Sequence, residues 1–188
     1  MPLRRQGSSR KRHIAFFIEK LSPANIREAE SLRDKTFPNP DNGEEQLLRA
    51  SLEAVKYSNV LLRNDVETLS YRVAKDQSSF NVIGLTGLYT EIGDDPDNCW
   101  LGWFCVQERF RGFGIGKKLL DFSIEMAGKM GKKWLHVYTY DSNTFRPAIN
   151  LYRKHGFEMY NESKAGGNRI YLKRKIDKGD FKRTNEIT

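Results

Sequence analysis

The spacing of apolar residues alternates between strand-like and helix-like segments, with turn residues between them. Residues 13–21 alternate loosely and predict a first strand. Ser22 and Pro23 then supply an N-cap residue and a first-turn proline for a helix expected over residues 23–34. Beyond a turn rich in proline and asparagine, apolar residues recur at helical spacing over residues 47–55. Two helices are therefore expected before the main part of the sheet.

Three consecutive strands are predicted in the middle of the chain. We expect them over residues 68–75, 81–92 and 99–106, which are rich in β-branched and apolar residues. Polar turns over residues 76–79 and 93–98 connect them, so the three strands form a meander. The third segment is apolar almost throughout, as is typical of a central strand covered on both faces.

Helices and strands alternate in the last part of the chain. Apolar residues three and four positions apart predict a helix over residues 116–130, followed by a strand over residues 133–140. A short helix ends at His155, and strands over residues 157–160 and 169–175 close the fold. The pattern predicts an α/β fold of the α+β type, with a mixed, mostly antiparallel sheet of about six or seven strands flanked by about four helices.

Basic residues are concentrated at the two ends of the 188-residue chain. Residues 1–13 carry five basic and no acidic side chains, and residues 172–188 carry six basic and three acidic ones. These excesses together equal the formal net charge of +8, so residues 14–171 are neutral overall. A neutral body argues against the broad electropositive face of a nucleic-acid-binding protein.

The length of the chain fits one domain with a substantial core. We predict a single domain over residues 13–176 between a basic, flexible tail at residues 1–12 and a polar tail at residues 177–188. Residues 1–12 lack the apolar run of a secretory signal, and no stretch is long enough to span a bilayer. We therefore expect a cytoplasmic protein without membrane contact, a short organelle address being the alternative.

The cysteines and histidines do not form a recognisable site. Cys99 and Cys105 fall in one predicted strand, where about 3.3 Å per residue would place them roughly 20 Å apart, too far for a disulfide. His13, His136 and His155 are scattered, so we predict no metal site.

A glycine-spaced turn joins the third strand of the meander to the next helix. Gly112, Gly114 and Gly116 allow a tight turn and a close approach of the backbone to a ligand. The first amides of the helix have no intrahelical partner and lie at the positive end of its dipole. The turn predicts an anion site, with phosphate as the expected anion. The alternative is a tight connection without a ligand.

Spacing excludes two common phosphate-binding motifs. In a P-loop, Arg111 would stand where the first glycine belongs and Lys118 where the magnesium-binding hydroxyl belongs. The dinucleotide fingerprint requires G-x-G-x-x-G, whereas this sequence has G-x-G-x-G without an acidic residue at the expected place on a following strand. The remaining pattern is R-x-x-G-x-G over residues 111–116.

A second motif lies in the helix that ends at His155. Residues 148–157 read A-x-x-x-Y-x-x-x-G-F, with Tyr152 one turn from the helix end. Alone, such a tyrosine packs and hydrogen-bonds like any other. In this order and on these elements, the two motifs resemble the GNAT-type N-acetyltransferase family. The resemblance covers about residues 73–176 and implies a fold of the acyl-CoA N-acyltransferase type.

The resemblance implies acetyl-CoA as cosubstrate and assigns residues to it. The backbone of Phe104, Cys105 and Val106 would pair with the pantetheine arm. The pyrophosphate would be held by backbone amides of Arg111, Gly112, Phe113, Gly114, Ile115, Gly116 and Lys117. Asn143 resembles a CoA-contacting asparagine, although it lies five rather than three residues before Ala148. Tyr152 would donate a proton to the departing CoA thiolate.

The base and the acceptor are left open by the sequence. Glu108, Glu91 and Asp141 are candidate bases, with a chain of water molecules as an alternative. The aromatic residues Trp103, Tyr138 and Tyr140 either line an acceptor pocket or pack in the core. The turn with Asp94, Asp95 and Asp97 either attracts a cationic amine or is a solvated hairpin tip. In this fold, residues 23–57 and 157–170 would set acceptor selectivity.

We expect an acetyl-CoA-dependent N-acetyltransferase that acts on a primary amine of a small molecule or peptide by direct attack in a ternary complex. The alternatives are a non-catalytic acetyl-CoA-binding module and a nucleic-acid-associated protein that uses its basic tails. The oligomeric state, including a homodimer, stays open.

Overall fold

A computed structural model describes residues 14–38, 43–163, 168–177 and 179–180. The predicted tail over residues 1–12 lies outside the described residues, as does most of the predicted tail over residues 177–188. Residues 164–167, between the last two predicted strands, lie outside them as well.

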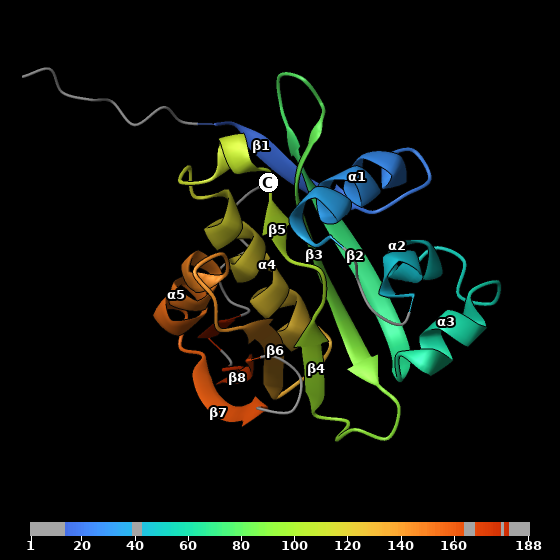
Figure 1. The fold of residues 1–188 in the computed structure, drawn as a ribbon, viewed down its shortest axis with the longest axis vertical. Helices are drawn as coiled ribbons and strands as arrows, with labels where there is room; N and C mark the ends of the chain where they lie inside the picture. The colour runs from blue at the N-terminus through green and yellow to red at the C-terminus, as the bar shows by residue number, and fades with distance from the viewer. Residues whose placement is uncertain (1–13, 39–42, 164–167, 178, 181–188) are drawn as a thin grey trace, which may run out of the picture.

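One sheet runs through the described part of the chain (Figure 1). Its strands are β1 (Phe16–Lys20), β2 (Val66–Asp76), β3 (Val82–Glu91), β4 (Asn98–Leu101), β5 (Cys105–Val106), β6 (Trp134–Tyr140), β7 (Glu158–Ser163) and β8 (Arg169–Lys175). They follow the order β1-β2-β3-β4-β6-β8-β7, with β5 paired to β3. The β4–β6 pair is parallel and the other strand pairs are antiparallel, which confirms the predicted mixed, mostly antiparallel sheet.

Helices pack on both faces of this sheet. The helices are α1 (Ile26–Thr36), α2 (Leu47–Ala50), α3 (Ser58–Arg63), α4 (Ile115–Lys129) and α5 (Arg146–Lys154). Adjacent residues of β3 show the two sides: Leu85 packs with Leu32 of α1, whereas Thr86 hydrogen-bonds Ser123 of α4 at 2.7 Å. Successive strand residues point to opposite faces, so α1 and α4 cover opposite sides.

The first predicted helix begins later than its sequence signals indicate. Asn25, not Ser22, is the N-cap residue of α1. The Asn25 side chain accepts the amide of Ser22 at 2.8 Å and donates to the Lys20 carbonyl at 3.2 Å. These bonds hold residues 22–25 in a turn, because a short amide side chain competes with the helix for backbone partners.

The second predicted helix is wrong in its extent. Only Leu47–Ala50 is α-helical, preceded by the 3-10 helix η1 (Glu44–Gln46), and a separate α3 follows. The Ser51 hydroxyl donates to the Leu48 carbonyl at 2.8 Å just where the helix ends. Val55 was expected on the apolar face but is 93% exposed.

The expected continuous strand over residues 99–106 is broken into β4 and β5. At the break, the Gly102 amide donates to the Gly87 carbonyl of β3 at 2.8 Å. The chain therefore stays attached to β3 on one side while it separates from β6 on the other. The predicted length of this strand was wrong, and its interruption creates the opening described below.

Candidate acyl-transfer site

The parallel strands β4 and β6 separate after only three paired positions. Trp100 faces His136 in the last pair, and the remaining residues of β6, from Val137 to Tyr140, pair only with β8. The described chain thus leaves one edge of β6 open opposite β5. The two strands therefore splay apart beyond the Trp100–His136 pair.

The backbone of β5 offers hydrogen-bonding groups to the splay. The Gln107 amide donates to the Ile83 carbonyl at 2.9 Å, which marks a hydrogen-bonded pair of the β3–β5 ladder. Since hydrogen-bonded and non-hydrogen-bonded pairs alternate, Cys105 turns its backbone groups toward β3, and Val106 turns its groups toward the splay. The Val106 carbonyl supports this orientation, because it accepts a hydrogen bond from Arg111 Nε at 3.1 Å and Arg111 lies outside the β3–β5 ladder.

The glycine turn leads directly from this edge into α4. Gly112 and Gly114 have φ angles of +81° and +84°, and a Cβ at either position would meet nothing within 4 Å. Gly114 is the N-cap residue, and the first amide that donates to it is that of Lys118. Within the described residues, the amides of Gly112 to Lys117 donate to no protein group. The surface above the turn is open, so these donors fit an anion such as a pyrophosphate.

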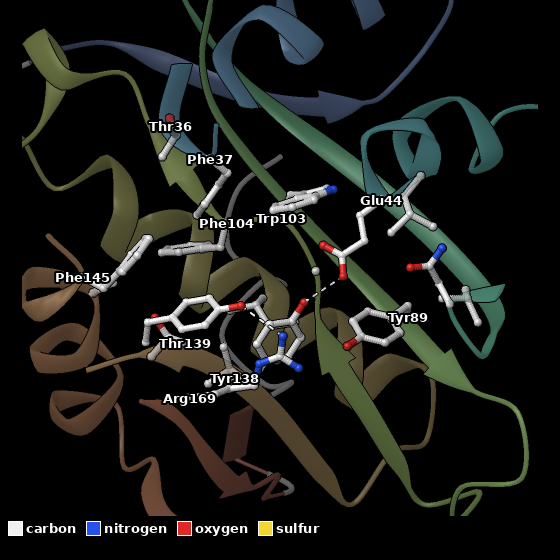
Figure 2. A pocket seen from close by; sticks show the side chains of 18 of the residues that line it. Thr36, Phe37, Glu44, Tyr89, Trp103, Phe104, Tyr138, Thr139, Phe145 and Arg169 are labelled. Atoms are coloured by element: carbon white, nitrogen blue, oxygen red, sulfur yellow. Dashed lines mark hydrogen bonds between the residues drawn. The ribbon is translucent and has the colours of Figure 1, made fainter. Parts of the chain in front are cut away.

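A cavity of about 680 Å³ continues the splay on the sheet face that carries α1 and α2 (Figure 2). Phe104 lies near the break in the sheet, and Glu44, Tyr138 and Arg169 surround the space in front of it. Tyr152 also lines the cavity. Trp103, Tyr138 and Tyr140 all line this cavity.

Tyr152 projects from α5 into the core beside the splay. Its side chain is only 4% exposed, and its ring centroid lies 5.8 Å from that of Phe104 and 5.6 Å from that of Phe157. Burial, followed by the nearby Cys105 thiol, raises the pKa of the Tyr152 phenol well above its usual value. The phenol is therefore protonated and neutral at physiological pH.

The candidate bases occupy different environments. Glu91 lines the cavity at the end of β3, and burial, then Asp94, then Asp65 raises the pKa of its carboxyl group. Glu108 lies exposed in the 3-10 helix η2 (Glu108–Phe110), outside the cavity lining, and Asp141 is exposed as well. The structure brings Glu91 and Tyr152 to one cavity.

Asn143 lies outside the cavity lining. It is exposed in the loop before α5, whereas its neighbours Thr144 and Phe145 line the cavity. The Phe145 ring stacks on that of Phe37 with centroids 6.1 Å apart, which closes one side of the opening.

The aspartates of the β3–β4 turn hold the turn together. Asp94 accepts the Trp100 Nε1 at 3.0 Å and the Asn98 amide at 2.9 Å. Asp97 forms an ion pair with Lys133 at 2.5 Å. Neither these two carboxylates nor that of Asp95 lines the cavity. Their positions favour the structural interpretation of this turn.

Several cavity residues carried no signal in the sequence. Glu44 comes from η1, Tyr89 from β3 and Arg169 from β8, and these segments are far apart along the chain. Tyr89 was visible only as an apolar strand position, and nothing in the local sequence around Glu44 or Arg169 marks either residue. The fold alone brings them together.

No group of three or more potential metal ligands from histidine, cysteine, aspartate or glutamate occurs among the described residues. None of the described helices has the length and apolar character required to cross a bilayer.

Comparison with known proteins agrees with this geometry. Residues 67–159 match the model of an acetyltransferase (GNAT) domain. Over 90 residues the chain is 32% identical to the spermine/spermidine N(1)-acetyltransferase of Bacillus subtilis strain 168, a match that covers 46% of this chain and 58% of that relative.

Solved structures share the fold over most of the chain. An acetyltransferase of the GNAT family from Staphylococcus aureus Mu50 has a TM-score of 0.67 at 19% identity, and the match covers 87% of this chain and 100% of that one. A chain of the NatC complex bound to Gag peptide and CoA has the same TM-score at 18% identity, with the same two coverages. Together with the splayed sheet and the glycine turn, these similarities lead to one conclusion. The chain belongs to the GNAT acetyltransferase family.

Proposed function

We propose that this protein transfers the acetyl group of acetyl-CoA to a primary amine, by direct attack in a ternary complex. The observation that carries the proposal is the continuity of three features. The glycine turn, the outward-facing edge of β5 and the cavity with Tyr152 follow one another, so they would form one path from an anion site to an acceptor space.

The anion end of this path supports binding of the CoA pyrophosphate. Six consecutive amides, from Gly112 to Lys117, have no hydrogen-bond partner among the described residues at the start of α4, and the helix dipole favours negative charge there. The outward-facing groups of Val106, and by the same alternation those of Phe104, would pair with the pantetheine arm as an added strand does.

Acetyl-CoA supplies a thioester, which a neutral amine can attack without an enzyme-bound intermediate. As the new C–N bond forms and the C–S bond breaks, the departing thiolate takes a proton from the Tyr152 hydroxyl. The attacking nitrogen loses a proton to a base, for which we propose Glu91, directly or through water. Holding both reactants in the cavity supplies the proximity that the reaction needs.

The acceptor is an amine-bearing small molecule or peptide. The curated relative from B. subtilis is a spermine/spermidine acetyltransferase, which makes polyamines the first compounds to test. The cavity carboxylates Glu44, Glu91 and Asp65 would attract a protonated amine before it loses its proton. Aromatic walls formed by Tyr89, Tyr138 and Trp103 would exclude water from the reacting atoms.

Thiol release from acetyl-CoA tests this function. The full chain would be screened against polyamines, aminoglycosides, amino acids and peptides with free N-termini, with acetyl-CoA binding measured separately by calorimetry. We expect saturable binding and turnover of at least one amine class. Saturable binding without turnover of any amine would favour a non-catalytic acetyl-CoA-binding module, and failure to bind would refute the proposal altogether.

A further inference from the structure

Arg169 presents a fixed guanidinium group to the proposed acceptor cavity. It lies opposite Tyr140 in the β6–β8 ladder, and its Nη2 donates to the Tyr140 hydroxyl at 3.0 Å. Its Cζ lies 4.6 Å from the centroid of the Tyr138 ring and 5.5 Å from that of Tyr140. Figure 2 shows Arg169 close to Tyr138 at the base of the cavity. Two rings and one hydrogen bond therefore orient its plane.

This cation has no carboxylate partner within the part of the chain that the structure describes. Arg33 and Arg174, two other largely buried arginines, form ion pairs with Asp34 and Asp180. Arg169 forms none, and its buried Nε has no hydrogen-bond partner among the described residues. A half-buried guanidinium with unused donors is costly to maintain unless a ligand uses them.

The carboxylates of the cavity lie on the other side of Tyr138. The Tyr138 hydroxyl donates to Glu44 at 3.5 Å, while the Arg169 guanidinium lies over the Tyr138 ring. Glu91 and Asp65 line the same space. Arg63 lies among these three carboxylates, so this part of the lining has an excess of acidic groups, whereas Arg169 is the charged residue that β8 contributes. The cavity is therefore matched to a ligand that carries both charges.

On the basis of the proposed function, we propose that Arg169 binds a carboxylate of the acceptor, so that the preferred substrates are amino acids or similar amino carboxylates. A guanidinium presents paired N–H donors that match the two oxygens of a carboxylate. A ligand with only amino groups would instead place a second cation near Arg169. A carboxylate would avoid Glu44, Glu91 and Asp65, which would attract the amino group, so an amino carboxylate would bind in one orientation.

Matched pairs of acceptors that differ only in the carboxylate test this assignment. Lysine is compared with cadaverine, and alanine with ethylamine, by kcat/KM in the thiol-release assay. We expect the carboxylate member of at least one pair to be preferred by about tenfold or more, as for a charge-assisted bidentate contact. In Arg169→Met this preference should disappear. No preference in the native protein, or a preference that survives in Arg169→Met, would overturn the inference.

Three further variants separate recognition from folding. Lys173→Met removes a cation from the same face of β8, where Lys173 lies over Trp134 and Tyr160 outside the cavity lining, so it should keep the preference. Arg169→Lys keeps the positive charge but lacks the paired N–H donors of a guanidinium. Its carboxylate preference in kcat/KM should therefore lie between those of the native protein and Arg169→Met. Tyr140→Phe removes the hydroxyl that orients Nη2 and should reduce the preference severalfold. A reduction by Lys173→Met equal to that by Arg169→Met would contradict the assignment.

Binding of the acetylated products distinguishes failure of this inference from failure of the proposed function. Calorimetry in the presence of CoA compares the affinities of Nε-acetyl-lysine and N-acetylcadaverine. This measurement does not require turnover. Turnover without a carboxylate preference in either assay refutes the role of Arg169 alone. A carboxylate preference in binding without any turnover refutes the proposed function and leaves the recognition site standing, and absence of both refutes both.

Discussion

The phenol ring of Tyr71 lies against Gly87, its partner across strands β2 and β3. A Cβ at residue 87 would be 2.2 Å from Cδ1 of this ring, and a Cβ at Gly102 would be 3.0 Å from its hydroxyl oxygen. Tyr71 is 2% exposed and lines the floor of the cavity. The ring thus occupies the space of two absent side chains beside the point where β4 ends. Tyr71 and the two glycines form one packing unit below the splay.

Substitution of Gly87 by alanine should destabilise the fold through this contact. We expect a loss of about 1–3 kcal/mol in the free energy of unfolding, because the ring has to move from its packed position. Urea unfolding of Gly87→Ala measures this loss. In a Tyr71→Ala background the same substitution should cost much less, since the obstructing ring is absent. Equal costs in both backgrounds would show that the contact is not responsible.

Substitution of Gly114 by aspartate should abolish binding of CoA. The side chain would enter the open space above the free amides and place a negative charge at the proposed pyrophosphate site. Gly93→Asp is a matched control, because Gly93 also has a positive φ, +78°, and open space around its Cβ position. Both variants should lose about 1–2 kcal/mol of stability from backbone strain. Equal CoA affinity in the two variants, measured by calorimetry, would exclude the turn as the anion site.

Removal of the Tyr152 hydroxyl should reduce turnover without weakening acetyl-CoA binding. We expect kcat of Tyr152→Phe to fall by more than about tenfold, because proton donation to the leaving thiolate is lost. Tyr160→Phe is a suitable control, since Tyr160 is 43% exposed and lies outside the cavity lining. If Tyr152→Phe kept normal kcat, the tyrosine would be a packing residue only.

The pH dependence of turnover should identify the base. Burial, then Asp94, then Asp65 raises the pKa of Glu91, so its basic form appears only at a higher pH than that of an ordinary glutamate. The acid limb of the kcat profile should therefore lie above the usual glutamate range and change in Glu91→Gln. Glu108→Gln should leave the profile unchanged, because Glu108 is exposed outside the cavity. A profile altered by Glu108→Gln alone would transfer the role to that residue.

Stability should fall in alkaline solution. Burial raises the pKa of Cys99 and of Cys105 to about 12, and it also raises the pKa values of Tyr71, Tyr138 and Tyr152. Unfolded cysteine and tyrosine ionise near about 8.5 and about 10. Above those values the unfolded chain loses protons that the folded chain keeps, so the free energy of unfolding decreases as the pH rises. Urea unfolding between about pH 8 and about pH 11 measures this decrease, and a constant stability would contradict it.

Local patterns in the sequence were sufficient for most of the fold and for the position of the glycine turn. Glycine spacing and helix-start physics predicted the turn at residues 111–116, and α4 begins there at Ile115. Apolar alternation predicted β2, β3, β6 and β8 to within a few residues. These features depend on neighbours in the chain, and one sequence contains all the information about such neighbours.

The break between β4 and β5 could not be predicted in the same way. An apolar run reads as one strand, whereas the interruption at Gly102 depends on Gly87 and Tyr71 in two other strands. The helix over residues 47–55 failed for a related reason, since side-chain hydrogen bonds and the packing of α3 override a leucine pattern.

The acceptor side of the site was decided by tertiary structure alone. The sequence by itself determined that the chain has a glycine-spaced turn before a helix, a second helix with a tyrosine on its inner face and a mostly antiparallel sheet. Only the folded structure places Glu44, Glu91 and Arg169 around one cavity, with Tyr138 in contact with both Glu44 and Arg169. The physical reason is that these contacts join residues far apart in the chain, whose proximity is set by strand order and splay rather than by any local pattern.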